Sequence, residues 1–149
     1  MPPMTVRDRG YFASVETALS DAGRELLPGH MNIEIVEIAV GSAKMRCHLR
    51  QHHLAPNGFM HAGSVVSLAD TAAGYGCVGN LPEGAIGFTT MELKTNFLGT
   101  LMEGSMIAES TMVHGGRTTQ VWDVEVTDEA TGKLLALFRC TQLVLYPRL

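Results

Sequence analysis

One carboxylate stands alone in a long run of small and apolar residues. The run reads HAGSVVSLADTAAGYG, residues 61–76, and Asp70 is its only Asp, Glu, Lys or Arg. Burying an ionised carboxylate is costly unless a hydrogen bond or an opposite charge compensates it, and no Lys or Arg lies within two helical turns of Asp70. Such an acid, if it can be reached from a cleft, is suited to act as a general base or nucleophile. The alternative is a structural carboxylate that is hydrogen-bonded to a backbone donor or to Thr71.

The same run predicts a helix from about residue 62 to residue 78. It contains glycines at positions 63, 74 and 76, and each glycine inside a helix costs roughly 1 kcal/mol relative to alanine. Such a helix has to pack closely against its neighbours, and because it has no charged face we expect it to be buried.

The rest of the chain predicts one further helix and six strands. Helical spacing predicts a helix over residues 8–27, which ends at Pro28–His30. Residues 51–60 are predicted to form a loop, in which the adjacent His52 and His53 point apart. Alternating patterns predict strands over residues 31–40, 42–50, 85–98, 105–115, 118–128 and 133–146, with a hairpin turn at Gly41-Ser42. This inventory indicates an α+β fold, an antiparallel sheet around one central helix.

Composition narrows the class of protein. The chain has 149 residues, of which 46% are hydrophobic and 17% charged, and a net charge of −4 without a Lys/Arg run, so nucleic acid is not an expected partner. No segment approaches the roughly 20 apolar residues that span a bilayer, and the start of the chain lacks the apolar region of a signal peptide. Three scattered cysteines fit a reducing compartment and form no zinc-binding spacing. We therefore expect a cytoplasmic protein without a membrane partner, a metal or another cofactor.

The central run resembles a known family. Preceded by APNGFM and followed by GFTTMELKTNFL, it is similar to the hot-dog-fold acyl-CoA thioesterases, and most similar to their PaaI-type, phenylacetate-degradation-related branch. The resemblance runs from about Asn32 to Tyr146. It implies a long helix wrapped by an antiparallel sheet. We expect one domain over residues 1–149, with a helical extension over residues 1–30 that lies outside the resemblance. The resemblance further implies a homodimer that often assembles into a homotetramer.

The resemblance also implies roles for four residues. Asp70 matches the general base or nucleophile that acts on the thioester. Ala62 matches the residue whose backbone N–H polarises the thioester carbonyl, and His61 matches the histidine that shapes the helix start. Thr90 falls where the family often has a Ser or Thr that orients the attacking water. This chemistry is physically consistent, because a helix N-terminus offers free N–H groups to the negative charge that develops on the carbonyl oxygen.

Two positions depart from the family pattern. The family commonly has HGG where this chain has HAG, which narrows the pocket by one methyl group. Many relatives have Asn or Gln six residues before His61, where this chain has Ala55. Asn57 could supply an amide from the same loop, or it could be the turn residue of the sequence PNG.

The substrate is expected to be an acyl-CoA with an aryl or medium-chain acyl group, because the residues around the site are mostly apolar. The substrate-binding candidates are Asn57, Gly58, Phe59, Gly63 and Val65. Lys94, Arg117 and Arg139 are candidates for the CoA phosphates or, alternatively, ordinary solvated charges.

The spacing of Ala62 and Asp70 predicts where the site lies. Eight residues on one helix span about 12 Å, which is too far for one thioester to contact both groups. If both act, they come from different subunits. The resemblance implies an acyl-CoA thioesterase, and the spacing places its site at a dimer interface. The alternatives are a non-catalytic acyl-CoA sensor on the same fold and a hot-dog hydratase or dehydratase.

Overall fold

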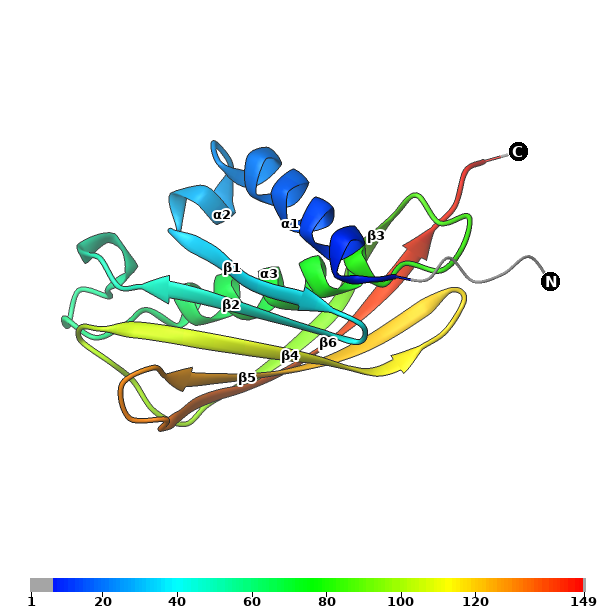
Figure 1. Ribbon diagram of the computed structural model, residues 1–149. Helices are drawn as coiled ribbons and strands as arrows, with labels where there is room; N and C mark the ends of the chain where they lie inside the picture. Colours follow the sequence, from blue (N-terminus) through cyan, green and yellow to red (C-terminus); the bar gives the residue numbers. More distant parts are fainter. Residues whose placement is uncertain (1–6, 149) are drawn as a thin grey trace.

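The computed structural model describes residues 7–148 and contains one six-stranded sheet with its helices on one side (Figure 1). Residues 1–6 of the expected helical extension lie outside this range. The elements, in chain order, are α1 (Arg9–Gly23), α2 (Leu27–His30), β1 (Ile33–Ala39), β2 (Ser42–His48), the short 3-10 helix η1 (Gln51–His53), α3 (Ala62–Gly79), β3 (Gly87–Phe97), β4 (Ser105–Gly115), β5 (Thr119–Asp128) and β6 (Leu134–Leu145). The predicted central helix and all six predicted strands are confirmed.

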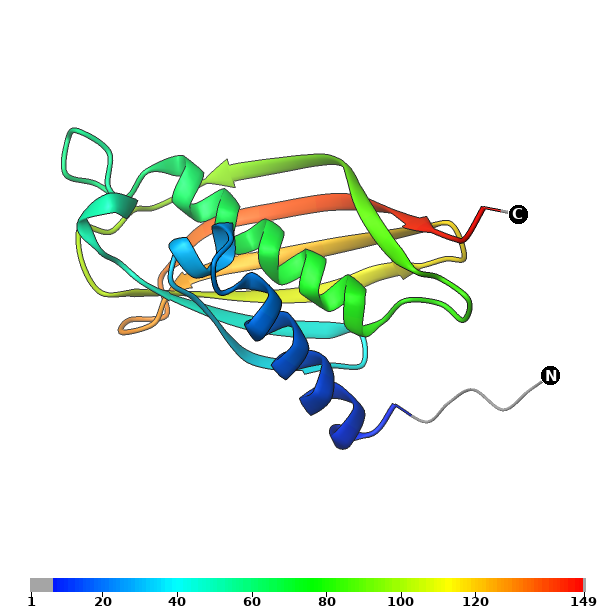
Figure 2. The same cartoon turned by 90° about the horizontal axis from the view of Figure 1, so that it is seen from above.

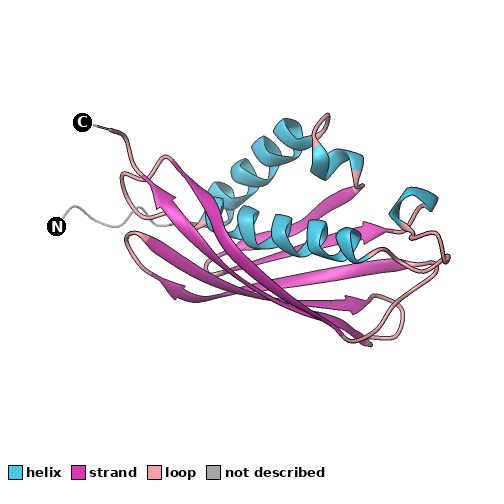
Figure 3. Ribbon diagram, turned by 180° about the vertical axis from the view of Figure 1, so that it is seen from behind, coloured by secondary structure: helices cyan, strands magenta, loops and turns pink. Residues whose placement is uncertain are grey.

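The sheet is antiparallel throughout, with the strand order β1-β2-β4-β5-β6-β3. Figure 2 shows α3 crossing the middle of one face, with α1 beside it on the side of β1. Seen from behind, the other face of the sheet carries no helix of the described residues (Figure 3). The expected α+β, hot-dog-like architecture is therefore confirmed. No helix among residues 7–148 is long and apolar enough to cross a membrane.

Glycines allow the sheet to approach α3 closely. A Cβ at Gly76 would lie 2.7 Å from the ring of Trp122, and a Cβ at Gly74 would lie 2.9 Å from the ring of Phe88. Both distances are shorter than real side chains tolerate. The indole of Trp122 is fully buried at the centre of the core. The two glycines lower the helix propensity of α3, but they permit this close packing.

The expectation that α3 is buried on all sides is wrong for one stripe of the helix. Its buried face packs on β2, β4 and β5, but a stripe remains partly exposed. This stripe consists of Val66, Ser67, Asp70, Thr71, Tyr75 and Val78. The small residues of α3 lie on the face that packs on the sheet, and the single sheet covers only that side of the helix.

The N-terminal helix also ends earlier than its apolar spacing predicts. α1 stops at Gly23, and Pro28 lies in the first turn of α2 instead of ending the preceding helix. A proline fits the first turn of a helix because its missing N–H would have no partner there.

β3 forms one edge of the sheet. It pairs with β6 on one side, and no described strand pairs with its other side. The register shifts between Thr90 and Glu92, which places a β-bulge at Met91. Apolar side chains on and beside β3 are at least 41% exposed: Ile86, Met91, Leu93, Phe97 and Leu98. An unpaired edge strand with exposed apolar side chains is a surface suited to a partner.

Candidate active site

The first turn of α3 carries one free backbone donor. His61 is the N-cap, and its Nδ1 accepts a hydrogen bond of 2.8 Å from the N–H of Gly63. A Cβ at position 63 would lie 2.9 Å from that same Nδ1, so this cap favours a glycine. The hydrogen bonds found among residues 7–148 include none donated by the N–H of Ala62. Ala62 is also exposed, and its N–H belongs to the positive end of the helix.

A buried histidine holds this helix start in place. The carbonyl of His53 accepts hydrogen bonds from the N–H of His61 at 2.9 Å and from Ser64 Oγ at 2.7 Å. The His53 ring is fully buried, and burial lowers the pKa of His53. Its Nδ1 accepts from the N–H of Arg50 at 2.7 Å, so the ring hydrogen is on Nε2, which lies 2.8 Å from the carbonyl oxygen of Met31.

The sequence analysis missed this role of His53. The prediction that His52 and His53 point apart is wrong, since their ring centroids are 4.1 Å from each other. The backbone at Gln51–His53 is a 3-10 helix and not an extended segment. Neighbouring side chains therefore do not alternate there as they would in a strand.

Asp70 lies on the partly exposed stripe of α3, with one oxygen inside the protein. Its Oδ1 is buried and has no hydrogen-bond partner, and none of the ion pairs among residues 7–148 includes it. Burial raises the pKa of Asp70, and the nearby Thr90 hydroxyl offsets part of that rise. The fold thus brings together an acid from α3 and a hydroxyl from β3, 20 residues apart in the sequence. A buried carboxylate oxygen without a donor is an avid proton acceptor.

The Thr90 hydroxyl is itself held by a residue that the sequence analysis did not single out. Thr90 Oγ1 donates a hydrogen bond of 2.9 Å to Oε1 of Gln142 on β6. The two residues are direct partners in the β3–β6 ladder. Nothing in the local sequence around Gln142 indicates this contact.

The loop before α3 is a set of tight turns. Asn57 Oδ1 accepts from the N–H of Phe59 at 3.1 Å, and Gly58 has a φ of +85° that favours glycine. Phe59 is exposed, and the neighbouring Met102, which a Cβ at Gly58 would contact at 3.6 Å, is exposed as well. Val65, by contrast, is only 2% exposed and packs in the core beneath the helix start.

Two of the three basic candidates for the CoA phosphates already have partners. Arg139 binds the carboxylate of Asp123 through Nε at 2.5 Å and through an Nη at 2.6 Å. The Arg117 guanidinium lies over the ring of Tyr146, 5.5 Å from its centroid. Lys94 is exposed and forms no ion pair with residues 7–148.

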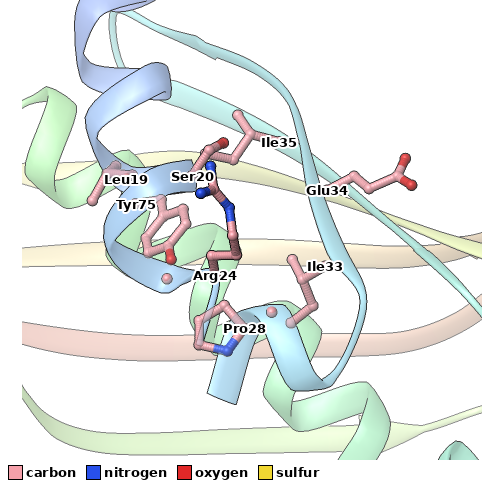
Figure 4. A pocket seen from close by; sticks show the side chains of 10 residues that line it. Leu19, Ser20, Arg24, Pro28, Ile33, Glu34, Ile35 and Tyr75 are labelled. Atoms are coloured by element: carbon pink, nitrogen blue, oxygen red, sulfur yellow. The ribbon is translucent and has the colours of Figure 1, made fainter. Parts of the chain in front are cut away.

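A cleft of about 320 Å³ opens elsewhere, between α1, α2, β1 and α3 (Figure 4). Arg24, Pro28, Ile33 and Tyr75 are among the residues around it. Tyr75 follows Asp70 by five residues and is turned about 140° around the helix axis. The cleft therefore opens on a different side of α3 from Asp70. No group of three or more His, Cys, Asp or Glu side chains within residues 7–148 is arranged to hold a metal ion.

Comparisons with known proteins agree with this architecture. The thioesterase superfamily model matches residues 57–135, which include α3 and most of the sheet. The chain is 35% identical over 111 residues to a 1,4-dihydroxy-2-naphthoyl-CoA hydrolase of Listeria monocytogenes, covering 74% of this chain and 89% of the relative.

Solved structures share the fold. A mutant thioesterase from Pseudomonas aeruginosa superposes with a TM-score of 0.81 at 23% identity, covering 87% of this chain and 93% of that one. The PaaI protein from the phenylacetic acid degradation operon of Escherichia coli superposes with a TM-score of 0.77 at 23% identity, covering 90% and 96%. The matched family model spans the helix that carries Asp70 and more than half of the chain, so this protein belongs to the thioesterase superfamily.

Proposed function

We propose that this protein hydrolyses acyl-CoA thioesters, with Asp70 as the general base or nucleophile and the N–H of Ala62 as the oxyanion donor. The observation that carries the proposal is the state of Asp70. One of its oxygens is buried without a hydrogen-bond donor, on a stripe of α3 that the protomer leaves open. Leaving such an atom unpaired costs free energy, and a role in proton transfer accounts for it.

Each group has a defined part in the proposed reaction. The carbonyl oxygen of the thioester accepts from the N–H of Ala62, where the helix dipole favours its developing negative charge. Asp70 takes a proton from a water molecule whose oxygen attacks the carbonyl carbon, and Thr90 helps to orient that water. The carbon–sulfur bond then breaks, and the proton returns to the departing thiolate. Alternatively, an oxygen of Asp70 attacks the carbonyl carbon, the carbon–sulfur bond breaks, and CoA leaves as its thiolate. Water then hydrolyses the resulting anhydride, which regenerates the Asp70 carboxylate and supplies the proton that the thiolate takes up.

The proposed site requires two copies of the chain. Ala62 and Asp70 lie at opposite parts of one straight helix, about 12 Å apart along its axis. The unpaired edge of β3 and its exposed apolar side chains offer a surface for a second copy. In a two-fold dimer each site would combine Ala62 of one subunit with Asp70 of the other, and each dimer would hold two sites.

An acyl-CoA with an aromatic or medium-chain acyl group is the proposed substrate. Phe59 and Met102 expose apolar surface beside the loop that leads into α3. The Listeria relative is a hydrolase of an aromatic acyl-CoA by its name, which supports the same class. The reducing cytoplasm stays the proposed location, since the three cysteines are buried free thiols.

Thiol release tests the proposal. Purified protein is mixed with aryl-, medium-chain and long-chain acyl-CoAs, and free CoA is followed with a thiol-reactive dye. We expect turnover by the native chain and at least a ~100-fold loss in Asp70→Asn, the usual scale for a positioned base. The Asn variant keeps the size of the side chain, and its fold is checked by circular dichroism.

The same assay separates the alternatives. Tight acyl-CoA binding without thiol release would indicate a sensor on this fold. Hydration of an enoyl-CoA, read from its loss of absorbance without thiol release, would indicate a hydratase. Near-normal thiol release by a well-folded Asp70→Asn variant would remove Asp70 from the mechanism.

A further inference from the structure

Gln142 is a buried amide directly beside the proposed site. It lies on β6, is fully buried, and is the ladder partner of Thr90. Its Oε1 accepts from Thr90 Oγ1 at 2.9 Å, and its Nε2 lies 3.4 Å from Cys140 Sγ. The amide therefore presents its acceptor, and not its donor, to the threonine.

Two acceptors compete for the single hydrogen of the Thr90 hydroxyl. One is Oε1 of Gln142, and the other is the carboxylate of Asp70, whose pKa the Thr90 hydroxyl can lower by donating to it. In this structure the hydrogen is directed to Gln142, and Oδ1 of Asp70 is left without a donor. The hydroxyl of a threonine has one hydrogen and two lone pairs, so its lone pairs remain available to the Asp70 side.

We infer that Gln142 is a positioning residue that holds the hydrogen of Thr90 away from Asp70. This inference rests on the proposed function of Asp70 and extends it. While Gln142 accepts its hydrogen, Thr90 donates less to the carboxylate of Asp70, which therefore stays a stronger proton acceptor than it would be beside a free hydroxyl. Once Asp70 has taken a proton from water, it can donate that proton to the free lone pair of Thr90. The three side chains then form one chain of hydrogen bonds from Asp70 through Thr90 to Gln142.

Other titratable groups near Asp70 are few. Cys77 on α3 and Cys140 on β6 are buried, and burial raises the pKa of each thiol to about 12, so both stay neutral in a neutral assay. Glu92 on β3 is exposed, and its Oε1 accepts from the hydroxyl of Thr141. These groups are the same in every variant below, so differences between variants report on Thr90 and Gln142.

The test uses Gln142→Met, which keeps an unbranched side chain of similar size and removes the amide. The pKa of Asp70 is measured by carboxyl NMR titration, with its signal assigned from its absence in Asp70→Asn. We expect the pKa to fall by about one unit, since Thr90 then donates to the ionised carboxylate. The acidic limb of the kcat/KM profile should move by the same amount, with kcat reduced and KM little changed. Gln142→Leu is the second variant if Gln142→Met does not fold.

Double variants show whether Gln142 acts through Thr90. In a Thr90→Val background, the Gln142→Met change should cause no further change in the Asp70 pKa or in the pH profile of kcat/KM. In a Thr90→Ser background, which keeps the hydroxyl, the downward shift should return. A merely structural role for Gln142 would lower stability equally in all three backgrounds.

Gln120 provides the matched control. It is a buried glutamine on β5, paired with Gln142 in the sheet, but its amide donates to the carbonyl of Asn80 and accepts from Trp122 Nε1. Gln120→Met should lower the melting temperature and leave the Asp70 titration unchanged.

Three results overturn the inference: an unchanged Asp70 titration in Gln142→Met, an upward shift, or a full effect that persists in Thr90→Val. An upward shift would mean that the amide donates to Thr90. If the native chain releases no thiol from any acyl-CoA, the proposed function fails, while the NMR titration still decides the role of Gln142.

Discussion

His61 and Gly63 form a closed cap at the start of α3, in which the histidine Nδ1 accepts the glycine N–H at 2.8 Å. The cap occupies one backbone donor, whereas the neighbouring N–H of Ala62 has no partner among residues 7–148. The two adjacent N–H groups therefore differ: that of Gly63 caps the helix, and that of Ala62 does not. This difference requires that position 63 has no Cβ.

A methyl group at position 63 should therefore disturb the cap. In Gly63→Ala the new Cβ would lie 2.9 Å from His61 Nδ1, so the imidazole has to move and the cap is lost. We expect a loss of about 1 kcal/mol in stability and roughly tenfold in kcat, measured by thermal melting and thiol release. Gly87→Ala is the control, since a Cβ there meets nothing within 4 Å. Equal behaviour of the two variants would show that the cap has no part in catalysis.

The proposed sharing of the site between two subunits predicts complementation between two inactive variants. Ala62→Pro removes the N–H at the first position of a helix, where proline is tolerated, and Asp70→Asn removes the base. Each variant alone should be inactive. After subunit exchange, about half of the dimers are mixed, and each mixed dimer has one intact site, so activity should return to roughly a quarter of the native value. If mass spectrometry shows exchange and the mixture stays inactive, both groups belong to one subunit.

The open edge of β3 predicts how the proposed dimer forms. Phe97→Lys places a charge among the exposed apolar side chains of β3 and should shift the chain toward monomers with little thioesterase activity against acyl-CoA. Sedimentation at several protein concentrations measures the shift. Val40→Lys is the control, because Val40 is also apolar and exposed but lies at the turn between β1 and β2. A Phe97→Lys variant that remains a dimer would place the interface elsewhere.

The environment of Asp70 predicts a dependence of stability on pH. Because burial raises the pKa of Asp70 in the folded state, the folded chain binds a proton more tightly than the unfolded chain. Ionisation of Asp70 therefore lowers the free energy of unfolding as the pH rises from the Asp70 pKa of the unfolded state through that of the folded state. Above that range, the free energy of unfolding stays at the lower value. Asp70→Asn should melt higher than the native chain at pH 7, by about 2 °C, and the difference should disappear toward pH 3. A variant that melts lower at pH 7 would contradict the unpaired state of Oδ1.

The sequence predicts the central helix and the strands well, because their patterns are local. The run of small residues from Ala62 onward indicates both the helix and its close packing. Pro28 is ambiguous in the sequence, since a proline can end one helix or begin the next. Only the packing of α2 decides which of the two Pro28 does.

The parts of the site that the sequence could not indicate depend on distant contacts. Gln142 looks like an ordinary polar residue in an alternating strand. Its partner Thr90 lies 52 residues earlier, and their pairing depends on the register of β3 against β6, including the bulge at Met91. His53 is similar, because its buried position follows from the 3-10 turn and from its contacts with Met31 and Arg50.

The unpaired edge of β3 has a further consequence for the newly synthesised chain. Its free N–H and C=O groups form a template on which strands from other molecules can add, and such growth leads to aggregates when each added strand exposes a new edge. Antiparallel pairing of β3 with a second β3 would cover the β3 edges of both molecules at once, so neither β3 edge is left for further addition. Assembly would then protect the protein from misassembly during folding as well as complete its chemistry. Cells that produce the chain at low levels would face a longer interval in which this edge is exposed.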